Sequence, residues 1–160
     1  LVIACYRDKH RELGSHLPNF ANSPKHVQQI ELYHRGILLF QMDGFKSYTQ
    51  AQQEIQECCE SLESTGLDEF PLIVIVDDLT FCKASLSNFL WLCFTRSNPS
   101  HDIYGVKSFF QHKHWGCEGS LIIDARKKTH HAPELISDPS AVTKAKELIF
   151  KNPELMSYFR

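Results

Sequence analysis

The chain has 160 residues, of which 42% are hydrophobic and 22% are charged, the proportions of one globular domain with a single core. Its formal net charge of −2 gives no electrostatic reason to bind nucleic acid or an anionic membrane surface. No apolar run reaches the roughly 20 residues of a bilayer-spanning helix, and no secretory leader is visible.

The first part of the chain, residues 1–35, is expected to form an irregular arm and one short helix. Gly14, Pro18 and Asn22 interrupt any regular pattern. Ser23-Pro24 has the form of an N-cap followed by a first-turn proline, which predicts a short helix up to about His34.

Residues 36–136 are expected to form an α/β core. Ile37–Met42 and Leu72–Val76 are unbroken apolar runs, typical of strands that are covered on both faces. Between them, Ser47 and Gln50 have the spacing of a capping box that begins a long helix. The apolar face of this helix is predicted to be Tyr48, Ala51, Ile55, Cys58, Cys59 and Leu62.

A second helix is predicted to begin at Ser85 and to end before Pro99. Its residues Leu86–Phe94 are apolar nearly all round, which predicts burial on most sides. Ile103–Val106 and Leu121–Ala125 are predicted to be further strands. A long connection, which contains Phe109–Cys117, joins them.

Asp138-Pro139-Ser140 marks the start of a last helix, and a short helical end is expected at Pro153–Phe159. The order of the elements predicts a layered α/β/α domain with a mainly parallel, mixed sheet. Residues 137–160 are expected to form the helical tail of this domain. Residues 1–160 are therefore expected to form one domain with an N-terminal arm, an α/β core and this tail. The chain begins with Leu1 rather than Met, which favours a piece of a longer protein.

The cysteine pattern indicates a reducing compartment. No two cysteines form a Cys-x-x-Cys pair, and most of them stand among apolar residues, where cysteine packs as a small hydrophobe. We therefore expect a cytoplasmic protein without disulfides. The six cysteines are at positions 5, 58, 59, 82, 93 and 117.

Charged residues follow the apolar segments at two places. Asp77-Asp78 come just after the Leu72–Val76 strand, at the sheet edge where open α/β folds bind ligands. The pair could bind a metal, orient a base or cap the next turn. Arg96 ends the second helix and needs a partner if it is buried; Asp102 and Asp124 are the candidates.

The segment His112-x-His114-Trp115-Gly116-Cys117 gathers several chemical groups. Two histidines and Cys117 could supply three zinc ligands, although no strong fourth ligand is evident. Packing for structural reasons alone is the other interpretation. Arg126-Lys127-Lys128 and the neighbouring His130-His131 are expected to form a solvated loop.

Two stretches of the sequence together resemble a known family. They are Leu72–Asp78 (LIVIVDD) and residues 90–133 (LWLCFTRSNPSHDIYGVKSFFQHKHWGCEGSLIIDARKKTHHAP). These stretches are similar to the C-terminal domain of the UbiD family of decarboxylases, and within it most similar to the menaquinone-biosynthesis branch. The resemblance extends from about Arg35 to Ile136 and implies an α/β fold. It also implies removal of CO2 from aromatic acids with a prenylated flavin mononucleotide (FMN) as cofactor.

The resemblance also implies roles for individual residues. In the family the long connection faces the flavin site, so one wall of the substrate pocket would be formed by Phe109, Phe110, His112, His114 and Trp115. Asp77, Asp78 and Arg96 match family positions and would support the site. The family places a flavin-phosphate lysine just before the Leu72–Val76 strand, where this chain has Pro71 or Leu72, so Lys83 is considered as a substitute.

The family's catalytic Glu-Arg-Glu groups and its ligands for a divalent, manganese-type metal are not found in this sequence. No catalytic residue is therefore assigned to this chain, and the isolated chain is expected to be inactive. Its expected partners are the flavin-binding region of the same protein, an aromatic carboxylic acid, and further copies of itself bound through the tail at 141–160. The alternative function is a non-catalytic assembly or binding module with the same fold.

Overall fold

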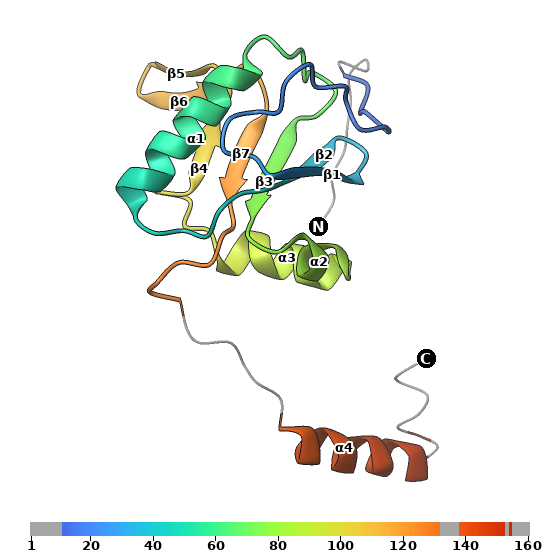
Figure 1. Cartoon of the computed structure of the whole chain (residues 1–160). Coiled ribbons are helices and arrows are strands. Elements are labelled where there is room, and N and C mark those ends of the chain that lie inside the picture. Colours follow the sequence, from blue (N-terminus) through green and yellow to red (C-terminus); the bar gives the residue numbers. More distant parts are fainter. Residues whose placement is uncertain (1–10, 132–137, 153, 155–160) are drawn as a thin grey trace.

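The computed structural model describes residues 11–131, 138–152 and 154 (Figure 1). The strands of this described part are β1 (Gln29–His34), β2 (Ile37–Gln41), β3 (Leu72–Val76), β4 (Ile103–Gly105), β5 (Ser108–Gln111), β6 (His114–Cys117) and β7 (Leu121–Asp124). The helices are α1 (Tyr48–Leu62), α2 (Leu79–Lys83), α3 (Leu86–Thr95) and α4 (Pro139–Lys151).

The main sheet has five strands in the order β1-β2-β3-β7-β4. Its three central strands, β2, β3 and β7, run parallel to one another, whereas the edge strands β1 and β4 run antiparallel to their neighbours. Helices cover both faces of this sheet, as Figure 1 shows. The expected layered α/β/α domain with a mixed sheet is therefore confirmed.

Helix α1 covers one face of the sheet. Ser47 caps it, since the Ser47 hydroxyl accepts a hydrogen bond from the backbone N–H of Gln50 at 3.2 Å. The apolar positions of α1 recur every three or four residues, so they form one stripe that packs on the sheet. The buried side chains of α1 are Ala51, Ile55, Cys58, Cys59 and Leu62, as the sequence predicted. Tyr48, which was predicted on the same face, is 37% exposed, so the prediction is wrong for this residue.

Helices α2 and α3 cover the other face. Phe89, Leu92 and Cys93 of α3 are buried against the sheet. The prediction that α3 is buried on most sides is wrong, because its remaining large apolar residues face solvent. These are Leu86, Leu90, Trp91 and Phe94, with exposed fractions of 63%, 41%, 47% and 79%.

The helix predicted before His34 is also wrong, because that segment forms strand β1. Pro24 lies in a turn in which its carbonyl accepts a hydrogen bond from Val27 N–H at 3.2 Å. In β1 the side chains alternate between the faces: Ile30 and Leu32 pack on the α1 side, and Tyr33 packs on the α3 side. Pairing with β2 thus overrides the local N-cap signal.

The long connection between β4 and β7 is a hairpin formed by β5 and β6. Its two-residue turn is His112-Lys113, and both residues have positive φ, 51° and 66°. This conformation matches the twist of a hairpin, although glycine and asparagine adopt it more easily. Gly105 lets the hairpin approach β4, since a Cβ on Gly105 would lie 2.4 Å from Cys117 Cβ.

We expect the change His112→Asn with Lys113→Gly to stabilise the hairpin by roughly 0.5–1 kcal/mol, because it relieves two left-handed non-glycine residues. Slower amide hydrogen exchange of Phe110 and Trp115 would show this gain. The single change Lys107→Gly, at another residue of positive φ outside the turn, is the control and should leave exchange at the turn unchanged.

Helix α4 begins where the sequence predicted, because the Asp138 side chain accepts a hydrogen bond from Ser140 N–H at 2.8 Å. None of its residues is buried. Of the expected helical end at Pro153–Phe159, only Glu154 is described. None of the helices in the described ranges is long and apolar enough to cross a membrane.

Candidate functional site

The candidate site residues lie at the two opposite ends of the parallel strands of the main sheet. We call these ends the carboxyl edge and the amino edge. Asp77 follows β3 at the carboxyl edge of the parallel strands. Strand β4 runs the other way, since Ile103 pairs with Ile123 and Gly105 pairs with Leu121. The chain therefore leaves β4 at the amino edge, where the β5–β6 hairpin lies (Figure 1). The hairpin residues and Asp77, Asp78 and Arg96 are thus not brought together within this chain.

The carboxyl edge holds a cluster of four buried charges and the partly buried Glu54, which we term the buried ion cluster: Glu54, Asp102, Asp124, Arg126 and Lys128. Arg126 donates from Nε and Nη2 to the two carboxylate oxygens of Asp124, at 2.9 and 3.0 Å. Its Nη1 donates to Glu54 at 3.0 Å and to the backbone carbonyl of Asp43 at 2.9 Å. The Arg126 side chain is completely buried.

Lys128 is the second buried cation of this cluster. Its ammonium donates to the carbonyl oxygens of Arg96, at 2.9 Å, and Asp124. It also lies 3.4 Å from a carboxylate oxygen of Asp102. Burial lowers the pKa of Lys128, while the carboxylates of Asp124 and Asp102 oppose that effect. The prediction of a solvated loop is therefore wrong for Arg126 and Lys128.

The cluster joins parts of the chain that are distant in sequence. Glu54 belongs to α1, Asp124 ends β7, and Asp102 precedes β4. No buried side-chain nitrogen or oxygen of the described residues lacks a hydrogen-bond partner. Because every charge is paired, the cluster is a structural element that fixes the loop after β7 against α1. The sequence signal for it was Asp124, a charged residue at the end of an otherwise apolar strand.

The acidic pair after β3 is engaged in holding the fold. Asp77 accepts hydrogen bonds from Arg96 Nη1 at 3.2 Å and from Lys127 N–H at 3.0 Å, one on each oxygen. Asp78 caps α2, since it accepts from Phe81 N–H at 2.9 Å. Among the residues that the structure describes, the Arg96 guanidinium pairs with Asp77 rather than with Asp102 or Asp124, which were the predicted candidates. Of the three roles considered for the pair, the structure shows one, capping by Asp78, while Asp77 forms an ion pair with Arg96.

Aromatic and imidazole rings cover the buried ion cluster at this edge. Tyr48 lies 5.4 Å from His101 and 6.3 Å from His130, between ring centroids. His131 is half-buried, and its Nδ1 accepts a hydrogen bond from Lys128 N–H at 3.1 Å. Nδ1 must be unprotonated to accept this bond. Burial lowers the pKa of His131, and the charges of His130 and Lys128 lower it further.

This lowered pKa predicts that stability depends on pH. The ordinary pKa of histidine is 6.5, so between the lower folded value and 6.5 the unfolded chain binds more protons than the folded chain. The free energy of unfolding should therefore rise with pH through that window. Urea titrations at several pH values give the free energy of unfolding, which should rise less steeply with pH in His131→Gln than in the parent chain. The matched change His16→Gln, at an exposed histidine, should leave this pH dependence as in the parent chain. The same pH dependence in both variants would contradict the role given to His131.

The hairpin at the amino edge is exposed. Phe110 and Trp115 are directly paired across the strands, so their side chains share one face. Their exposed fractions are 81% and 38%. Phe109 lies on the other face, with its ring over Gly116, and His114 pairs with Gln111 on that face. The five residues predicted to form one pocket wall are therefore divided between two faces and the turn.

The zinc alternative has no support in this geometry. His112 sits in the turn with φ of 51°, so it does not share an extended backbone with His114 as predicted. Among the described residues, no group of three histidine, cysteine or acidic side chains could hold a metal ion. All five cysteines in this part of the chain are free thiols, and burial raises the pKa of Cys58, Cys59 and Cys82 to about 12.

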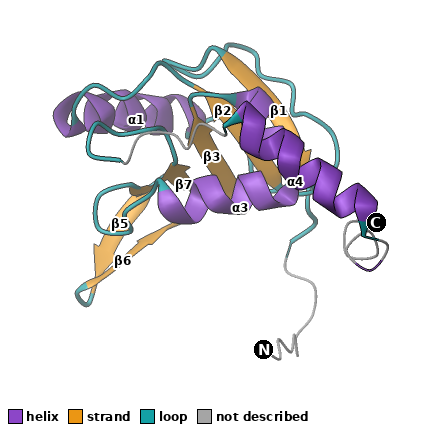
Figure 2. Cartoon of the chain, turned by 90° about the horizontal axis from the view of Figure 1, so that it is seen from below, coloured by secondary structure: helices purple, strands orange, loops and turns teal. Residues whose placement is uncertain are grey.

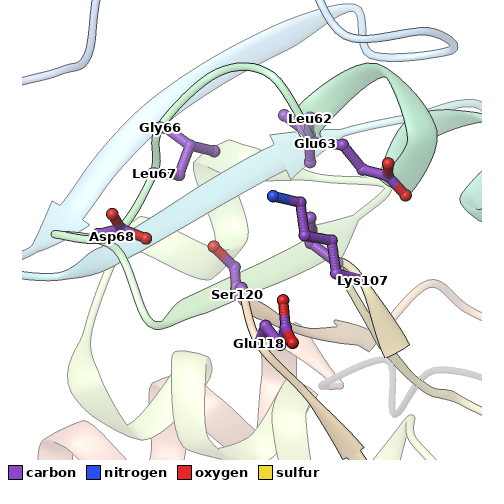
Figure 3. A pocket seen from close by; sticks show the side chains of 10 residues that line it. Leu62, Glu63, Gly66, Leu67, Asp68, Lys107, Glu118 and Ser120 are labelled. Atoms are coloured by element: carbon purple, nitrogen blue, oxygen red, sulfur yellow. The ribbon is translucent and has the colours of Figure 1, made fainter. Parts of the chain in front are cut away.

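A hollow lies beside the hairpin, between the end of α1 and the base of β5 and β6 (Figure 3). Ser120 lines it and donates a hydrogen bond to the carbonyl of Phe70 at 2.6 Å, so the hollow is next to Pro71. Its charged lining consists of one ammonium and three carboxylates: Lys107, Glu63, Asp68 and Glu118.

Lys83, which was considered as a substitute for the family's phosphate lysine, lies far from the position of that lysine before β3. It lies on α2, which follows the carboxyl end of β3, and it is paired with Glu31 at 2.8 Å. Pro71 precedes the amino end of the same strand, and its carbonyl accepts a hydrogen bond from Leu121 N–H at 2.9 Å. Lys83 and Pro71 are therefore at opposite edges of the sheet.

Comparisons with known proteins connect part of the chain to decarboxylases. This chain is 33% identical over 91 residues to a 4-hydroxybenzoate decarboxylase subunit of Chlamydia pneumoniae. The match covers 56% of this chain and 16% of that protein. The chain thus spans about one sixth of the length of this curated relative. No protein-family profile matches the sequence.

Two solved structures are also similar to this chain. The UbiD-class enzyme HmfF from Pelotomaculum thermopropionicum, in complex with FMN, has a TM-score of 0.46 and 17% identity, over 74% of this chain and 28% of that one. The vanillic acid decarboxylase of Sedimentibacter hydroxybenzoicus has a TM-score of 0.40 and 16% identity, over 73% of this chain and 27% of that one. The match to the decarboxylase subunit agrees with the sequence stretches that resemble the UbiD family, so part of this chain is similar to a UbiD-like domain.

Proposed function

We propose that this chain is the C-terminal domain of a prenylated-FMN-dependent decarboxylase of aromatic acids, and that it contributes a wall of the substrate pocket. The observation that carries this proposal is the 33% identity over 91 residues to a protein of 4-hydroxybenzoate decarboxylation. A hydroxylated aromatic acid of quinone biosynthesis, of the menaquinone or ubiquinone type, is the proposed substrate. The proposed location is the cytoplasm.

The part of the chain that we assign to the pocket is the Phe110–Trp115 face of the hairpin. Flat apolar side chains suit an aromatic ring, because they remove it from water and stack on it. The largely exposed Phe110 has no such cover within the described residues. In a decarboxylase, a wall of this kind would position the acid and exclude water.

The residues at this edge do not fit the flavin phosphate. The single ammonium of the hollow, Lys107, is outnumbered by the carboxylates of Glu63, Asp68 and Glu118, which repel a phosphate dianion. Pro71 has no N–H to donate. We therefore assign the binding of the flavin and of its divalent metal to the flavin-binding region of the same protein. No catalytic group is assigned to this chain.

A non-catalytic assembly or binding module is the second candidate function. The observation that favours it is the use of Asp77, Asp78 and Arg96 in capping and ion pairing, which leaves them no chemical role in the described structure. Such a module would keep the fold and the exposed hairpin. It would act by binding another protein.

The first test uses the isolated chain and the full-length protein side by side. The isolated chain should release no CO2 from 4-hydroxybenzoate, and calorimetry should give a dissociation constant for FMN weaker than about 1 µM. The full-length protein, loaded with prenylated flavin, should release CO2. Submicromolar binding of FMN by the isolated chain would contradict the proposed division of roles. A full-length protein that binds no flavin would favour the assembly module.

We also infer that copies of the protein associate through the tail at 141–160. Helix α4 in this tail has no buried residue, although Leu148 and Phe150 are large and apolar, with exposed fractions of 65% and 73%. Surfaces of this kind are usually covered in an assembly.

A further inference from the structure

The β5–β6 hairpin carries opposite charge at its two ends. At its base, where it joins the rest of the domain, it adjoins the hollow described above (Figure 3). The three carboxylates and the one ammonium that line this hollow are those of Glu63, Asp68, Glu118 and Lys107. Burial raises the pKa of the Cys117 thiol, and the positive charge of Arg11 opposes that effect, so Arg11 also lies near the base. Carboxylates still outnumber cations there, and the base is acidic.

The other end of the hairpin, its tip, is basic. The turn residue Lys113 is exposed and has no ionic partner among the residues that the structure describes. No acidic residue occurs between Lys107 and Cys117. Figure 2 shows the hairpin projecting from the main sheet with this turn at its free end. An anion at the tip therefore meets an ammonium without a competing carboxylate beside it.

The turn holds this lysine in a conformation that is unfavourable for it. His112 and Lys113 both have positive φ, 51° and 66°, and asparagine and glycine adopt this conformation more easily. Backbone strain of this kind is concentrated at binding and catalytic sites. Folding alone gives no reason for a lysine at this position, so its ammonium points to a role in binding.

We propose that Lys113 binds the carboxylate of the aromatic acid, so that the acid lies along the hairpin with its carboxylate toward the tip. This inference rests on the proposed function and names the residue that orients the substrate. Trp115, which is paired with Phe110, is two residues from Lys113, about 7 Å along the strand. An aromatic acid whose ring lies on this pair and the flexible four-carbon stem of Lys113 together span that distance.

The charge difference between the two ends sets the direction of the acid. Repulsion by the carboxylates at the base disfavours the reverse orientation, in which the carboxylate of the acid would lie beside them. A phenol hydroxyl suits the base, because carboxylates accept hydrogen bonds from hydroxyl groups. The exposed Ser108, two residues before Phe110 and so on the same face, offers a further hydroxyl there. Lys113 should therefore select the acid over its uncharged amide.

The test is an NMR titration of the isotope-labelled 160-residue chain with 4-hydroxybenzoate and, as its uncharged match, 4-hydroxybenzamide. The acid should shift the amide signals of residues 110–115, and its dissociation constant should rise at least roughly fivefold in Lys113→Gln. Lys113→Arg keeps the charge and should keep the affinity within about twofold. Lys107→Gln removes another lysine of positive φ, at the base, and should change the affinity less than about twofold. The affinity for the amide should be the same in all variants.

Hairpin signals that do not move at up to about 10 mM acid would overturn the inference, as would equal effects of Lys113→Gln and Lys107→Gln. Either result would leave the decarboxylase proposal to its own test, because the titration involves neither flavin nor CO2. In the full-length enzyme, Lys113→Gln should raise KM for 4-hydroxybenzoate roughly fivefold with little change in kcat. A full-length protein that releases no CO2 would remove the proposed function but would leave an acid-binding tip that the titration had demonstrated.

Discussion

Replacing Asp124 by alanine is expected to lower the free energy of unfolding by about 3–5 kcal/mol, because it leaves two buried cations without their shared partner. Asp124 accepts two hydrogen bonds from the guanidinium of Arg126, at 2.9 and 3.0 Å. It also lies 3.8 Å from the ammonium of Lys128. Glu54 and Asp102 would remain, but neither binds Arg126 through two oxygens.

Urea unfolding followed by circular dichroism measures this loss. The midpoint should fall while the dependence on urea stays the same, since the surface that unfolding exposes is unchanged. Asp68→Ala is the matched control, because Asp68 is an exposed aspartate; its effect should stay within about 0.5 kcal/mol. A loss below about 1 kcal/mol for Asp124→Ala would show that the cluster does not hold the loop after β7 in place.

The second large effect concerns catalysis and rests on the proposed function. In the full-length enzyme, Phe110→Ala with Trp115→Ala should lower kcat/KM for CO2 release roughly 30-fold. Each aromatic contact with the substrate ring contributes about 1 kcal/mol, and about 1.4 kcal/mol corresponds to a factor of ten in rate. Phe110 is largely exposed, but Trp115 is 38% exposed and lies beside Gly105, so circular dichroism of the double variant serves to check that the fold is kept.

The hairpin itself supplies the control for this experiment. Gln111→Ala changes the opposite face of the same strand and should alter kcat/KM less than twofold. An effect on KM with little change in kcat would indicate a wall that binds the acid throughout the reaction. Unchanged kinetics in the double variant would remove the hairpin from the pocket. The domain would then serve for assembly alone.

The strands and helices of the core were readable from local patterns. The apolar runs Ile37–Met42 and Leu72–Val76 predicted buried strands, and the spacing from Ala51 to Leu62 predicted the buried face of α1. Strand β1 was not readable in this way. Ser23-Pro24 favours a helix locally, but β2 needs a partner for its backbone at the edge of the sheet, and residues 29–34 supply it.

The sequence did not predict where the candidate residues lie in the folded domain. The hairpin residues and the Asp77-Asp78 pair were assigned to one site because the family resemblance implied it. Strand β4 separates them, because its antiparallel direction carries the chain to the other edge of the sheet. Direction within a sheet depends on pairing between distant segments, and no local pattern specifies it.

The sequence by itself determined the central strands β2, β3 and β7, the helix α1 and the family that they resemble, because these depend on residue order and on periodic burial. Only the tertiary structure decided the environment of Arg126 and Lys128. In the sequence they belong to a short basic run, which in isolation would be solvated. In the folded protein Glu54, 72 residues before Arg126, comes within hydrogen-bonding distance of it. A charge is buried only where the fold brings an opposite charge to it, and long-range contacts alone determine that.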